Sequence, residues 1–130
     1  MADCILIGNS GSRNTLETVL YQSNNPNGTS VNVNDIINLT QSYTDFELIC
    51  IEWGYSASYT YIGVSNLFRS EFLADIQNLN EGKSWNLVEV FMAGYSTIGL
   101  AFAFTATNQI KITEKLGSVS SHYIRRIVGL

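Results

Sequence analysis

Residues 51–64, IEWGYSASYTYIGV, place aromatic side chains among glycine, serine, alanine and threonine, with little charge. Tyrosine and tryptophan offer rigid contact area and a polar tip at a small entropic cost. Their flat rings can stack on the apolar face of a sugar, while neighbouring hydroxyl and amide groups hydrogen-bond to its hydroxyls. Trp85, between Ser84 and Asn86, has similar neighbours. The predicted ligand-binding residues are therefore Trp53, Tyr55, Tyr59, Tyr61 and Trp85.

A second interpretation of the same residues stays open. Trp53 follows an apolar run and would then be a core residue, with the tyrosines packed between subunits. Tyr55 and Tyr59 lie in the turn-like Gly/Ser-rich part of the stretch, so we expect them at the surface more than Trp53.

The residue types that enzymes use do not form a catalytic motif in this chain. His122 is the single histidine, and no Gly-x-Ser-x-Gly sequence supports a serine nucleophile. The acidic residues Asp45, Glu47 and Glu52 are expected to be solvated charges at turns or edges, since glycosidase carboxylates must face each other across a cleft. We expect no catalytic residues, no metal and no cofactor.

The composition limits the kinds of partner. The chain has 130 residues, of which only 14% are charged, and its net charge is −4. Apart from Arg125-Arg126 its basic residues are scattered, which argues against nucleic acid and anionic membranes. No run approaches the roughly 20 apolar residues of a membrane span, so we expect no membrane insertion. Cys4 and Cys50 are expected to be apolar thiols rather than a disulfide.

Short β-branched and aromatic runs predict an all-β fold, an antiparallel β-sandwich. The predicted strands are 18–22, 33–39, 46–53, 86–93, 97–106, 106–116 and 123–130. Residues 23–30, SNNPNGTS, predict a turn. The spacing of apolar residues over 67–79 fits a helix and a strand plus loop equally well.

One strand carries a face of small residues. Gly99, Ala101 and Ala103 alternate with Leu100, Phe102 and Phe104 in the run 97–106. The large side chains would fill a core, and the small ones would let a second sheet or another subunit approach closely. Together with the low charge, this face predicts an oligomer.

The C-terminal run 123–130, YIRRIVGL, is expected to be tied down as a closing strand. Strict alternation would send Ile124, Val128 and Leu130 into the core. Arg125 or Arg126 would then face solvent or an acidic partner, as an exposed ion pair worth roughly 0–1 kcal/mol.

Taken in order, these segments resemble the C-terminal receptor-binding domains of phage tail fibres and related baseplate or prophage proteins. The resemblance spans about residues 18–130. The matching residues are Leu20, Tyr21, Ile37, Leu39, Tyr43, Phe46, Leu48, Ile49, Ile51, Gly54, Ile124, Ile127, Gly129 and Leu130.

The resemblance implies a β-sandwich head over 18–130, preceded at 1–17 by an arm or the stump of a stalk. It further implies a homotrimer at the tail tip of a virion that binds a host cell-surface glycan or protein without catalysis. Two alternatives remain open: a structural virion protein, such as a tail or capsid-decoration subunit without a ligand, and a small glycan hydrolase.

Overall fold

The computed structural model describes residues 16–57, 60–77, 85–91, 96–117 and 121–130. Within these residues the chain forms nine strands, a short 3-10 helix η1 and one α-helix. Their bounds are β1 Thr18–Gln22, β2 Thr29–Ser30, β3 Ile36–Asn38, η1 Tyr43–Asp45, β4 Leu48–Ala57, β5 Thr60–Arg69, α1 Ser70–Gln77, β6 Trp85–Phe91, β7 Ser96–Ala106, β8 Gln109–Leu116 and β9 Ser121–Gly129.

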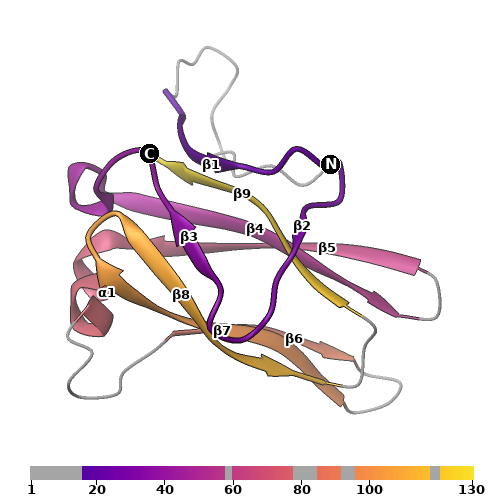
Figure 1. Ribbon diagram of the computed structural model, residues 1–130. Coiled ribbons are helices and arrows are strands. Elements are labelled where there is room, and N and C mark those ends of the chain that lie inside the picture. Colours follow the sequence, from indigo (N-terminus) through magenta and orange to yellow (C-terminus); the bar gives the residue numbers. More distant parts are fainter. Residues whose placement is uncertain (1–15, 58–59, 78–84, 92–95, 118–120) are drawn as a thin grey trace.

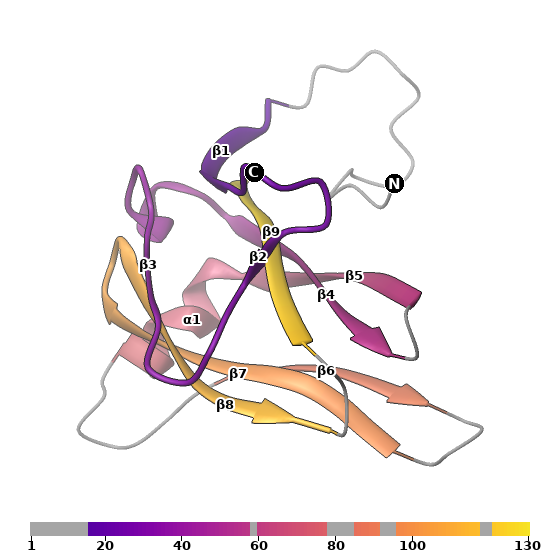
Figure 2. The same cartoon turned by 45° about the vertical axis from the view of Figure 1, so that its right-hand side comes forward.

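The strands form two antiparallel sheets that pack face to face (Figures 1 and 2). Sheet A has the order β1-β9-β4-β5, with β2 also paired to β9, and sheet B has the order β3-β8-β7-β6. The predicted all-β antiparallel sandwich is confirmed. The predicted N-terminal arm, apart from residues 16 and 17, lies outside the described residues.

The core lies between the sheets because each central strand turns one apolar set inward. On β4 the inward set is Ile49, Ile51, Trp53 and Tyr55. On β7 it is Ile98, Leu100, Phe102 and Phe104. The Phe68 and Phe102 rings meet edge to face across the two sheets, with centroids 5.9 Å apart. Fully burying one such side chain stabilises the fold by roughly 1.5–3 kcal/mol.

The stretch that looked turn-like is a hairpin of two ten-residue strands. Residues 54–57 continue β4, and β5 begins at Thr60, so the turn is confined to the hairpin tip. The ambiguous segment 67–79 divides: its first three residues end β5, and α1 follows from Ser70.

The small-residue face of β7 is covered within the single chain. Ala101 and Ala103 are buried although they alternate with the core-facing set, whereas Leu73 of α1 packs in the core cluster with the large residues of β7. This face does not supply an exposed strip for a second subunit.

A β-bulge in β9 interrupts the regular alternation that was expected of the C-terminal strand. Glu52 pairs with Arg126 and Trp53 with Ile124, so Arg125 is an extra residue between two consecutive pairs. Ile124 and Ile127 consequently enter the same core, whereas Val128 packs with Cys50 in a separate cluster. Arg125 and Arg126 both make ion pairs on the opposite, outer face.

Cys50 also differs from the expectation of an apolar thiol, because it is disulfide-bonded. The chain has one other cysteine, Cys4, which lies outside the described residues. Cys50 is buried beside Val128 on the outer side of sheet A.

His122 is buried where β9 meets sheet B. Its Nε2 lies 3.0 Å from the carbonyl oxygen of Leu116 on β8. Burial lowers the pKa of His122 below its usual value of 6.5, and nearby Lys115 acts in the same direction. The carbonyl groups of Leu116 and Gly99 oppose this shift.

We predict that His122 makes the protein less stable in mild acid. Its folded pKa is below 6.5, so the unfolded chain binds the proton more readily. The effect of His122 on the free energy of unfolding is therefore constant above about pH 6.5. This free energy falls as the pH drops from there toward the folded pKa. Thermal unfolding at about pH 7.5 and about pH 5 should show a smaller loss of melting temperature for His122→Gln than for wild type. Equal losses would show that His122 does not contribute.

Candidate functional site

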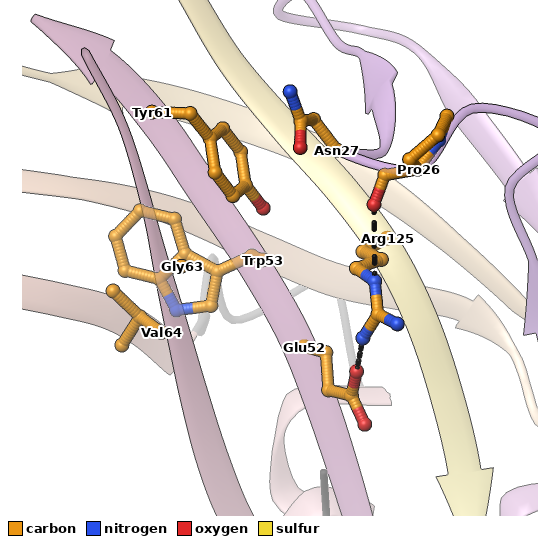
Figure 3. A pocket seen from close by; sticks show the side chains of 8 residues that line it. All are labelled: Pro26, Asn27, Glu52, Trp53, Tyr61, Gly63, Val64 and Arg125. Atoms are coloured by element: carbon orange, nitrogen blue, oxygen red, sulfur yellow. Dashed lines mark hydrogen bonds and ion pairs between the residues drawn. The ribbon is translucent and has the colours of Figure 1, made fainter. Parts of the chain in front are cut away.

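The candidate site is a pocket on the outer face of sheet A, the face turned away from the core. Its volume is about 480 Å³. Figure 3 shows Tyr61 on one side and Pro26, Asn27 and Arg125 on the other, with Glu52 beside the arginine. The lining residues are Pro26, Asn27, Glu52, Trp53, Tyr61, Gly63, Val64 and Arg125.

The turn predicted at 23–30 is confirmed over 25–28, while residues 29 and 30 form β2, and this turn builds one wall of the pocket. The Gly28 N–H donates to the Asn25 carbonyl, 3.0 Å away, which closes the turn around Pro26 and Asn27. Gly28 has a positive φ of 106° and touches the backbone of Ile124, where a Cβ would come within 2.9 Å of the carbonyl oxygen. Glycine is required there for both reasons, and it lets the turn lie directly on β9.

The opposite wall is Tyr61, whose hydroxyl end lies over Gly54. A Cβ at Gly54 would collide with the Tyr61 ring and would come within 2.6 Å of the Ile62 carbonyl oxygen. Tyr61 also meets Tyr123 of β9 edge to face, with ring centroids 5.7 Å apart. The missing side chain at Gly54 thus places a partly exposed tyrosine pair across β4.

Between the walls lies a chain of ion pairs centred on Glu52. This residue is only 2% exposed, and one carboxylate oxygen pairs with Arg125. The other oxygen lies 3.3 Å from Nη1 of Arg126, whose Nη2 lies 2.5 Å from Glu17. Nε of Arg125 also donates to the Pro26 carbonyl, 3.2 Å away, and so ties the turn to the sheet.

The two tyrosines experience different surroundings. Burial is the main cause that raises the pKa of Tyr61, with Glu52 and Tyr123 adding to it and Arg125 opposing it. Side-chain hydrogen bonds with Ser56 and Ser121 lower the pKa of Tyr123.

The structure does not bring the five predicted ligand-binding residues together. Tyr61 lines the pocket and is partly exposed. Trp53 borders it but is 1% exposed, and its Nε1 donates to Asn66 inside the sheet, 2.7 Å away. Tyr55 is 0% exposed, which contradicts its expected place in a surface turn.

Tyr59 lies outside the described residues. Trp85 begins β6 in sheet B, paired with Phe102, and therefore belongs to the other sheet. The ring of Tyr55 faces the core because β4 continues its alternation past Gly54 instead of turning.

Sequence reasoning missed Glu52, Arg125, Asn27 and Tyr123 as site residues. Glu52 was expected to be a solvated charge, and its burial between two arginines corrects that expectation. The available signal was the adjacent Arg125-Arg126 pair, since two arginines in an apolar strand require an acidic partner. The residues around Pro26 and Asn27 were predicted to form a turn, but not to form a wall of the pocket.

No family model matches the chain, and a search of curated proteins finds no similar sequence. Among the described residues, no group of three or more His, Cys, Asp or Glu side chains is arranged to hold a metal ion. No helix in the described part of the chain has the length and hydrophobicity to span a membrane.

We predict that Glu52→Gln destabilises the protein by about 3 kcal/mol, the lower end of the cost of breaking a buried ion pair. The amide cannot neutralise two guanidinium groups whose side chains are only 23% and 15% exposed. Urea unfolding measures the change.

Glu71→Gln is the matched control, because Glu71 pairs with Arg69 and both side chains are well exposed, at 64% and 65%. Its expected effect is within about 0.5 kcal/mol. Similar effects of the two substitutions would contradict the role assigned to Glu52.

Proposed function

We propose that this chain is a non-enzymatic binding head that recognises a cell-surface glycan in the pocket on the outer face of sheet A. The observation that carries the proposal is the pairing of Tyr61 with Tyr123 beside a pocket that also offers Asn27. A sugar ring can stack on a tyrosine face, and an amide can hydrogen-bond its hydroxyls. Such a site is a concave surface with a few convergent polar groups.

Two further observations support a role outside the reducing cytosol and on a particle. The disulfide of Cys50 is typical of proteins in oxidising surroundings, which include virion surfaces. The strand and turn pattern over 18–130 resembles the receptor-binding domains of phage tail fibres. On this basis we propose the tip of a virion tail as its location and a host surface as its partner.

The arrangement of Glu52 favours binding over hydrolysis. Both of its oxygens pair with arginines, and it is the one carboxylate among the described residues that line the pocket. Hydrolysis by two carboxylates requires one that acts as an acid. A small glycan hydrolase is therefore the weaker alternative.

The test is glycan-array binding of wild type and Tyr61→Ala. We expect Tyr61→Ala to weaken binding about tenfold, or roughly 1.4 kcal/mol, because it removes the stacking face. Tyr61→Phe keeps the ring and should retain most of the affinity. Tyr55→Ala is unsuitable, since the burial of Tyr55 makes that substitution a test of folding.

Leu67→Ala is the matched control on the same strand, because Leu67 is 53% exposed and does not line the pocket. It should bind like wild type. A folded wild-type protein that binds no glycan would instead favour the structural virion protein, and release of a shortened glycan would favour the hydrolase.

We also propose that the head is a homotrimer. The burial of Ala101 and Ala103 within one chain removes the small-residue face from its support. What remains is the resemblance and the low charged fraction of 14%. Light scattering at micromolar concentration should give about three times the chain mass of 14.4 kDa. A mass near 14.4 kDa would contradict the trimer.

A further inference from the structure

The positive and negative charges at the pocket are equal in number and balance each other. In the described part of the chain, Glu52 and Arg125 are the charged residues that line it, and they pair with each other. Arg126, next along β9, pairs with Glu52 and with Glu17. The four side chains carry two positive and two negative charges.

Two of the three guanidinium nitrogens of Arg125 are directed to the protein itself. Its Nη1 faces the Glu52 carboxylate, and its Nε donates to the Pro26 carbonyl. An acidic ligand would have to compete with Glu52 for this cation, and it would approach a carboxylate of its own sign. The net charge of −4 adds a general repulsion of anions.

We propose that the saccharide bound in this pocket is uncharged: a sugar without carboxylate, sulfate or phosphate groups. The inference rests on the proposed function and names the ligand class of that site. The neutral ring stacks on Tyr61, and its hydroxyls bond to Asn27 and to the pocket edge. The ion pairs shape the wall without attracting a charge.

The experiment measures binding of the full chain to two sets of immobilised oligosaccharides. The neutral set contains hexose, deoxyhexose and N-acetylhexosamine units, and the acidic set contains uronate, sialate, sulfate or phosphodiester groups. Each set is measured at about 50 mM and about 500 mM NaCl, which changes the screening of exposed charges severalfold.

We expect binding to members of the neutral set, with an affinity that changes less than about twofold between the two salt concentrations. Binding confined to the acidic set, or a fall of about tenfold in high salt, would overturn the inference and leave the proposed glycan binding intact. Binding to neither set would overturn the glycan-binding function, and this inference with it.

A charge-insertion pair tests the same point independently. Asn27→Lys places an unmatched cation in the pocket wall and should create salt-sensitive binding to the acidic set. Asn24→Lys, an exposed position of the same connection that does not line the pocket, makes the same change in net charge and should not. Identical acidic binding by wild type and both variants would show that charge in the pocket does not select the ligand.

Discussion

A carboxylate buried on a sheet face needs positive charge within hydrogen-bond distance. Glu52 is such a carboxylate, so sheet A must present cationic side chains on its outer face. A regularly alternating strand would present only one of two consecutive arginines to this face, because neighbouring residues point to opposite faces. The bulge at Arg125 removes this obstacle and puts two consecutive arginines on the same face. The irregularity of β9 is therefore what allows Glu52 to be buried.

The same bulge determines the shape of the outer face. Arg125 turns toward the 25–28 turn and bonds to the Pro26 carbonyl, so the turn stands beside the sheet as a wall. On the other side Gly54 leaves room for the Tyr61 ring, which leans over β4 toward Tyr123. A hollow results on a surface that a regular sheet would leave flat.

The local residue pattern was sufficient to predict the strands whose two faces are both apolar, as in β4 and β7, and to predict the turn within 23–30. It failed for β5, whose outer face carries Tyr61, Gly63 and Ser65 and therefore resembles a turn. It could not place Tyr55, because the composition of a strand does not tell which face is covered. The partner of Arg125 is 73 residues away in the chain, and a bulge has no periodicity. The sequence could thus predict the sandwich, but not the pocket.

An ion cluster of this kind contributes little to net stability. Desolvation of the charges offsets most of their attraction, and well-packed apolar residues would be as stable or more so. Apolar residues at Glu52 and Arg125 would, however, leave the Pro26 carbonyl without its guanidinium donor, and the tip of the turn without this side-chain link to β9. The cluster is best explained by its role in positioning the turn that forms one wall of the pocket. Since Arg125 joins the Glu52 carboxylate on the sheet to the Pro26 carbonyl of the turn, the position of this pocket wall depends on the same ion cluster that compensates the burial of Glu52.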